Sequence, residues 1–194
     1  MFNEGTERPF SSELLNEKRN GFCFINNIAV AARYLQKKYK IKRVAIIDFD
    51  VHHGNGTQEI FYNDNSVAYA STHEFPLFPG TGAENETGVG NIFNAPIKSG
   101  TKGIEFLKIF ENKILAPLDR FKPEVILISA GFDAHIRDPL ANINLESSDY
   151  FKITKKILEL ANIHSKGRII SFFEGGYDLK ALSESIKEHL IALK

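Results

Sequence analysis

Two hydrophobic patterns alternate along the chain. Short runs of consecutive apolar residues, rich in β-branched types and ended by Gly, Asp or Pro, predict strands. They are RVAIIDFDV at 43–51, SVAYAST at 66–72, EVILISAGF at 124–132 and RIISFFEGG at 168–176. Because the VAII and VILI runs contain no polar residue, both faces of these strands should be buried, as in a parallel sheet that lies between helices.

Segments whose apolar residues recur every three or four positions predict helices at 27–38, 104–114, 150–160 and 178–193. Ser147 or Ser148 is a candidate N-cap for the third helix. The last helix should bury one stripe, formed by Leu179, Leu182, Ile186, Leu190 and Leu193. The Gly-rich stretch 75–94 is predicted to be a long loop, and its length suits a functional loop as well as a flexible one. Alternating strands and helices predict one α/β domain with a mostly parallel sheet.

The composition excludes several classes of protein. The chain has 194 residues, 43% of them hydrophobic, which suits one domain with its own core. Because 24 Lys and Arg balance 24 Asp and Glu, we expect neither nucleic acid nor a membrane as partner. With Cys23 as the single cysteine, any metal must be held by His, Asp and Glu. The chain shows no signal peptide and no apolar run of membrane-spanning length, so we expect a soluble, cytoplasmic protein.

Acidic and histidine side chains follow three predicted strands, in DFDVHH, GFD and EGGYD. In open parallel sheets, ligands bind beyond the carboxyl ends of the strands. Asp48, Asp50 and His52 alternate along an extended backbone and share one face. Neighbouring buried carboxylates stay ionised only beside a cation or strong donors. Although an isolated Asp-x-His is often an accident, Asp50, His52 and Asp133 together would supply the three ligands of a catalytic zinc site.

Tyr177 follows two glycines, which let the backbone turn and approach a ligand closely. A tyrosine hydroxyl has a reference pKa of about 10 and remains a proton donor at neutral pH. It could stabilise the oxyanion that forms when water attacks a carbonyl group. Taken alone, Tyr177 would be better interpreted as a residue at the edge of the core.

Five ordered motifs resemble the zinc-dependent histone deacetylase superfamily, and more narrowly its class II-like and bacterial branch of deacetylases and acetylpolyamine amidohydrolases. They are GFCFINNIAVAARYL, IIDFDVHHGNGTQEIFY, FPGTGAENETGVG, ISAGFDAHIRDPLA and EGGYDL, and they extend from about Gly21 to the C-terminus. The resemblance implies a three-layer α/β fold of the arginase/deacetylase type. It also implies hydrolysis of an acetylated lysine or polyamine to acetate and the free amine.

The resemblance further implies roles for individual residues. Asp50, His52 and Asp133 would bind Zn²⁺, and Tyr177 would polarise the acetyl carbonyl. Asp48 and Ser71 fall where the family binds a monovalent cation, which would be K⁺. The predicted substrate-binding residues are Phe22 and Phe78 as aromatic walls, Leu140 near the rim, and Gly175 and Gly176. Without the family, Phe22 and Phe78 would be ordinary core aromatics.

Two departures from the family pattern affect the expected activity. Family domains are longer, so we expect the C-terminal portion only: one partial domain over 1–194, with a divergent segment at 1–20 and an exposed sheet edge. Association with a second copy or with a complementing N-terminal fragment would follow. Ser12 and Glu13 stand where the family carries a His pair that includes the general base. Loss of such a base lowers rates by about 10² to 10⁴-fold.

Three hypotheses remain open from the sequence. The first is a zinc amidohydrolase with impaired turnover. The second is an inactive, binding-only relative, motivated by Ser12 and Glu13. The third is a two-manganese hydrolase of the related arginase fold, which needs more bridging carboxylates than DFDVHH and Asp133 provide. Two further histidines, His164 and His189, are predicted to lie on helices, and we expect both on the solvated surface.

Overall fold

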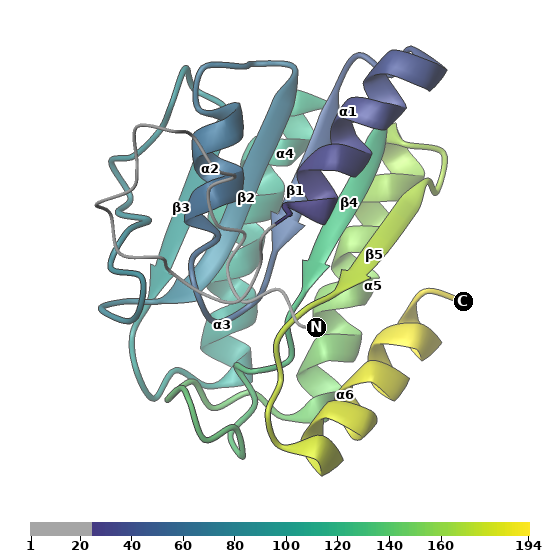
Figure 1. Cartoon of the computed structure of the whole chain (residues 1–194). Helices are drawn as coiled ribbons and strands as arrows, with labels where there is room; N and C mark the ends of the chain where they lie inside the picture. The colour runs from purple at the N-terminus through teal and green to yellow at the C-terminus, as the bar shows by residue number, and fades with distance from the viewer. Residues whose placement is uncertain (1–24) are drawn as a thin grey trace.

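The computed structural model of the chain describes residues 25–194, which form a parallel sheet between two layers of helices (Figure 1). The strand order is β3-β2-β1-β4-β5, and every neighbouring pair is parallel. The strands are β1 Val44–Asp48, β2 Val67–Glu74, β3 Ile92–Ile97, β4 Val125–Ala130 and β5 Ile169–Phe173. The helices are α1 Asn27–Tyr39, α2 Asn55–Phe61, α3 Gly103–Ile109, the π-helical segment Phe110–Leu115, α4 Ala116–Phe121, α5 Ser147–His164 and α6 Leu179–Ala192.

The central strand β1 shows why the apolar runs carry no polar residue. Val44 and Ile46 pack in the cluster that includes residues of α1 and α2. Ala45 and Ile47, which point to the opposite face, pack in the cluster that includes residues of α3 to α5. Because both faces are covered, every residue of β1 and β4 is buried. The prediction of a parallel α/β sheet with buried central strands is confirmed.

The sequence pattern missed three elements, of which α4 continues the helical run predicted at 104–114. Strand β3 begins inside the stretch predicted as a loop, and it contains Asn94 and Pro96. Proline removes a backbone donor and is confined in sheets mainly to edge strands, and β3 is such an edge. The short helix α2 begins with Asn55 and Gly56 and lacks a long apolar period. Polar and turn-forming residues therefore interrupt the apolar pattern in β3 and in α2, so the pattern did not predict these two elements.

The predicted cap of the third helix is wrong. The N-cap of α5 is Glu146, which forms a reciprocal capping box with Asp149. The Asp149 carboxylate accepts the N–H of Glu146 at 3.0 Å. The hydroxyl of Ser147 serves tertiary contacts, because it lies 3.3 Å from His135 Nε2 and accepts a hydrogen bond from Ser185 at 3.1 Å.

The predicted buried stripe of the last helix is also wrong in part. Leu179 and Leu190 are 80% and 55% exposed. The face of α6 that is buried consists of Ala181, Ser185, His189 and Ala192, while Leu182 and Ile186 pack at its margin. The side chains on this face are small or hydrogen-bonded, and none of them is a large apolar side chain.

The expectation of a solvated His189 is wrong. The residue is 3% exposed, and its ring nitrogens lie 2.7 Å from Thr154 Oγ1 and 2.9 Å from Ser171 Oγ. Its burial is possible because both nitrogens have partners. His164 is partly buried and lies 2.8 Å from an Asp119 carboxylate oxygen.

Candidate metal centre

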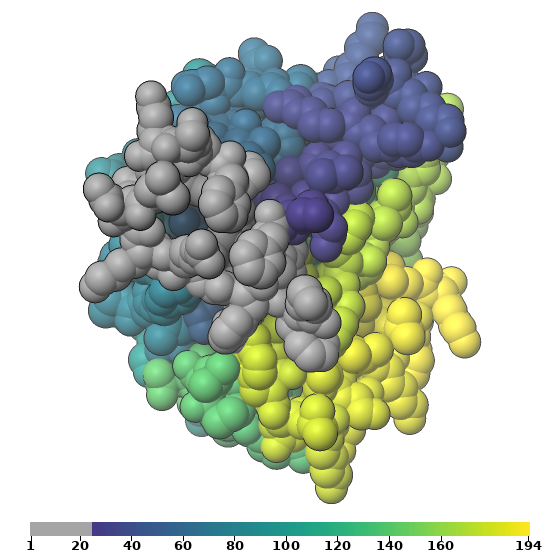
Figure 2. All heavy atoms as spheres, viewed as in Figure 1, coloured from purple at the N-terminus to yellow at the C-terminus, as the bar shows by residue number. Residues whose placement is uncertain are grey.

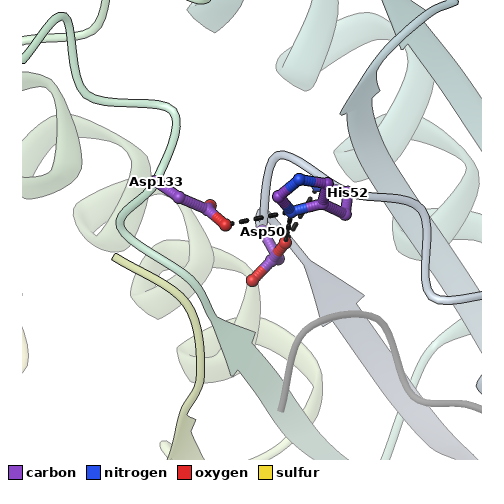
Figure 3. Close-up of side chains that lie close together, drawn as sticks. All are labelled: Asp50, His52 and Asp133. Carbon is purple, nitrogen blue, oxygen red and sulfur yellow. Dashed lines mark hydrogen bonds and ion pairs between the residues drawn. The ribbon is translucent and has the colours of Figure 1, made fainter. Parts of the chain in front are cut away.

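Asp50, His52 and Asp133 converge beyond the carboxyl ends of β1 and β4 (Figure 3). These two strands are parallel neighbours, so the segments that follow them lie side by side. His52 Nδ1 lies 3.2 Å from Asp50 Oδ1 and 3.1 Å from Asp133 Oδ2. One ligand atom from each of the three residues lies within 4.8 Å of the others, and all three residues are buried.

Backbone donors hold the two carboxylates of the centre. Asp50 Oδ1 accepts the N–H of His52 at 2.9 Å, and Asp50 Oδ2 accepts the N–H of Gly175 at 3.2 Å. Asp133 Oδ1 accepts the N–H of Val51 at 2.9 Å. Backbone donors from two chain segments, residues 51–52 and residue 175, therefore fix the orientation of these carboxylates, and such outer contacts commonly orient metal ligands.

The electrostatics of the centre favour a cation. Burial, followed by the charge of Asp50, raises the pKa of Asp133 to about 6. The same two causes raise the pKa of Asp48 well above its usual range. Burial alone would lower the pKa of His52, but hydrogen bonds and charges from Asp133 and Asp50 raise it to about 11. Buried carboxylates this close together call for a positive partner, which protonated His52 supplies when no metal is bound. A metal ion would take the place of that proton, and the Asp-His-Asp donor set fits Zn²⁺.

Gly175 leaves space that the centre requires. A Cβ atom at this position would lie 2.4 Å from Asp133 Oδ2 and 2.8 Å from Asp50 Oδ2, closer than real Cβ contacts. Gly176 has a φ of 137°, which L side chains rarely adopt. The structure thus places Gly175 at the centre, whereas a Cβ at Gly176 would meet Leu182 and Phe132 instead. Contact of either glycine with substrate stays a prediction.

Tyr177 comes two residues after Gly175, in the loop between β5 and α6, and is partly buried. Its N–H donates to Asp138 Oδ2 at 2.8 Å. Asp138 is a buried residue that the sequence reasoning missed. The available signal was a second Asp in FDAHIRDPLA, set before a proline in a segment that carries a candidate ligand. The role of the Tyr177 hydroxyl stays a prediction.

Two predicted substrate-binding side chains reach the surface. The Phe78 ring lies edge-on to the His52 ring, with 6.4 Å between centroids, and the residue is 45% exposed. Leu140 is 50% exposed in the loop between β4 and α5. The contact with His52 places Phe78 beside the centre, and the roles of Phe78 and Leu140 in substrate binding stay predictions. Phe22, Ser12 and Glu13 lie outside the described residues.

Asp48 and Ser71 are partners in the β1–β2 register. Asp48 Oδ1 accepts the N–H of Asp50 at 3.1 Å, and Asp48 Oδ2 accepts the Tyr69 hydroxyl at 2.8 Å. Ser71 Oγ lies 2.9 Å from His73 Nδ1. The sheet brings the two residues to adjacent strands, but these hydrogen bonds do not identify a cation, so the K⁺ site stays a prediction.

Known proteins are similar to this chain in sequence and in fold. Residues 15–193 match the family profile of the histone deacetylase domain. The chain is 43% identical over 190 residues to histone deacetylase 14, chloroplastic, of Arabidopsis thaliana, with 96% of this chain and 45% of that protein covered. It is 37% identical over 175 residues to the histone deacetylase-like amidohydrolase of Pseudomonas aeruginosa, with 88% and 46% covered.

A solved structure agrees with the sequence matches. The crystal structure of the HDA15 HD domain superimposes with a TM-score of 0.83 at 37% identity and covers 89% of this chain and 50% of that chain. The chain spans about half the length of the curated relatives it matches. The expected deacetylase-type α/β fold is therefore confirmed, and the chain belongs to the histone deacetylase family.

Proposed function

We propose that this chain carries the zinc site and part of the substrate site of a deacetylase that hydrolyses an acetylated lysine or a related acetylated amine. The observation that carries the proposal is the buried Asp50–His52–Asp133 cluster at the strand ends. Membership of the family and a relative named as an amidohydrolase support the reaction class.

Each described residue has a specific task in this proposal. Zn²⁺, when bound, would supply a Lewis acid that polarises the acetyl carbonyl and makes water more acidic. Asp50, His52 and Asp133 would hold it. The Tyr177 hydroxyl would donate a hydrogen bond to the acetyl oxygen as negative charge develops there. Phe78 would cover the substrate stem, which is uncharged once acetylated and therefore inexpensive to bury.

Two further hypotheses are distinguished by the same site. A binding-only protein is the alternative, because Ser12 and Glu13 stand where the resemblance to the family predicts the His pair that includes the base. A two-manganese hydrolase is disfavoured, since residues 25–194 contain one cluster of three metal-binding side chains and it offers two carboxylates. One transition metal per chain is therefore the expected stoichiometry.

The proposal is tested by metal analysis and acetate release. After reconstitution with Zn²⁺, the chain should hold about one metal ion and release acetate from an acetyl-lysine peptide. Tyr177→Phe should retain the zinc and lower the rate by about 10² to 10³-fold, the effect of losing one donor to an oxyanion. Failure to hold zinc would end the proposal, whereas zinc binding without acetate release would support the binding-only alternative.

We also propose that Asp48 and Ser71 contribute to a K⁺ site. Their position on adjacent strands, and the hydrogen bond from the N–H of Asp50 to Asp48, support this. Potassium chloride should raise the unfolding temperature above the value in tetramethylammonium chloride at equal ionic strength, and Asp48→Asn should remove the difference. Equal unfolding temperatures for the wild-type chain would contradict the K⁺ site.

We propose that β5 pairs with the remaining part of a deacetylase domain. Among residues 25–194, β5 has β4 as its neighbour on one side only, and Ile170 and Phe173 are 42% and 45% exposed. The opposite edge strand, β3, is mostly buried. In the space-filling view, the yellow-green atoms of β5 and its following loop reach the surface between α1 and α6 (Figure 2). The match covers 50% of the HDA15 chain, and the rest of a domain of that kind is the occupant we propose.

The single cysteine, Cys23, supports a reducing compartment, and we propose the cytoplasm. Within residues 25–194, no helix has both the length and the apolarity needed to cross a membrane.

A further inference from the structure

Asp138 connects two loops at the metal centre. It lies five residues after Asp133, and it is 7% exposed. Its Oδ2 accepts the N–H of Tyr177 at 2.8 Å, and its Oδ1 accepts the N–H of Leu140 at 3.0 Å. One carboxylate thus joins the backbone that carries Tyr177 to the backbone of the predicted substrate rim.

The Tyr177 loop has fixed points on both sides of this contact. Before it, the N–H of Gly175 donates to Asp50, and the carbonyl of Gly175 accepts the N–H of Phe132 at 2.8 Å. After it, Asp178 caps α6 by accepting the N–H of Ala181 at 2.6 Å. Between these points Gly176 offers wide conformational freedom. The hydrogen bond to Asp138 therefore restrains the Tyr177 backbone where the sequence is least restrained.

The chemistry of the contact requires a carboxylate. Two N–H donors approach the two oxygens of one side chain, and an ionised carboxylate accepts at both. An asparagine would accept at one oxygen and present an amide donor to the second N–H. The two bonds also offset the cost of burying the charge.

We propose that Asp138 is a positioning residue that fixes Tyr177 at the metal centre. The effect of Asp138 on turnover rests on the proposed deacetylase function. Its effect on the position of Tyr177 is independent of that function. Both statements can be measured separately.

The position is tested by fluorine NMR of the full chain labelled with 3-fluorotyrosine, with the Tyr177 resonance assigned from Tyr177→Phe. Asp138→Ala should shift or broaden this resonance, and Asp138→Asn should do so less. Glu74→Ala is the matched control, because Glu74 is another buried carboxylate that accepts two bonds from the same loop, from Asn142 N at 2.8 Å and Nδ2 at 3.1 Å. An unchanged Tyr177 resonance in Asp138→Ala would overturn the proposal; if that variant does not fold, Asp138→Asn decides.

Turnover is tested by a double-mutant cycle on the zinc-loaded chain. Asp138→Ala should lower kcat by about 10- to 100-fold with little change in KM, the range expected for a misplaced catalytic group. In the Tyr177→Phe background the same substitution should have less than about a twofold further effect, because coupled residues are not additive. Full additivity would contradict action through Tyr177. A wild-type chain without turnover would count against the proposed function and leave the NMR result to decide the positioning.

Discussion

At the scale of single residues, Gly175 contributes to the metal centre in two ways. Its backbone N–H orients the Asp50 carboxylate, and its missing side chain leaves room for oxygens of Asp50 and Asp133. A methyl group here would have to displace two buried, charged side chains whose positions define the cluster. Close packing around a buried site makes such a shift costly.

We therefore predict that Gly175→Ala lowers the affinity for Zn²⁺ by about 10- to 100-fold, the usual effect of disturbing groups that orient metal ligands. Titration against a competing chelator measures this. Gly80→Ala is the control: Gly80 has a φ of 83° but no atom within 4 Å of an added Cβ. It should cost about 1 kcal/mol of stability and leave zinc binding intact. Equal zinc affinity in Gly175→Ala and wild type would refute this role.

At the scale of elements, His189 joins α6 to α5 and β5. The Thr154 hydroxyl donates to the Tyr150 carbonyl at 2.6 Å, so it accepts from His189 Nδ1. Nε2 then accepts the Ser171 hydroxyl. The network assigns a neutral imidazole with its proton on Nδ1. Burial lowers the pKa of His189 from 6.5 to about 4.

This shift predicts acid sensitivity of the helical layer. The unfolded chain binds more protons than the folded chain between pH 6.5 and about 4. The stabilisation by neutral His189 is therefore complete above pH 6.5 and is lost as the pH falls from there towards 4. Between pH 7.5 and 4.5 the contribution of His189 to the free energy of unfolding should fall by on the order of 2 kcal/mol. Urea unfolding of the wild-type chain and of a His189 variant at both pH values measures this contribution. His189→Gln should lose less stability over this interval, and an unaltered pH dependence in the variant would contradict the assignment.

At the scale of the whole molecule, the two edges of the sheet differ. The β3 edge is mostly buried, whereas β5 carries exposed apolar side chains and, among residues 25–194, stands last in the strand order with β4 as its neighbour. Such an edge can pair with another strand. Because the two edges differ in exposure and the relatives are longer than this chain, we assign the proposed association with the remaining part of a deacetylase domain to β5.

We predict that Ile170→Lys weakens the 1:1 complex with a polypeptide comprising the part of the Pseudomonas aeruginosa relative that this chain does not cover. A reduction of at least about tenfold is expected, because a charge would be buried at the new interface. Ile104→Lys, at an 88% exposed position on α3, should have no effect. Light scattering and calorimetry measure stoichiometry and affinity. Absence of a complex would rule out this occupant, and self-association lost in Ile170→Lys would indicate a second copy instead.

The sequence alone predicted the central strands and the approach of Asp50 and His52 to Asp133. Its apolar runs specify buried parallel strands, and the parallel arrangement brings their carboxyl ends to one edge. The local signal failed for β3, whose Pro96 and Asn94 interrupt the apolar pattern, and for α6, whose leucines are partly exposed.

Only the tertiary structure decided which polar residues find partners. His189 is buried because Thr154 and Ser171, on other elements, satisfy its nitrogens. Asp138 holds the backbone of Tyr177, 39 residues away in the chain, by accepting its N–H. Periodicity records which side of an element faces the core, since it depends on near neighbours in the chain. Hydrogen-bond partners remote in sequence leave no periodic trace, so their pairing emerges only when the elements pack.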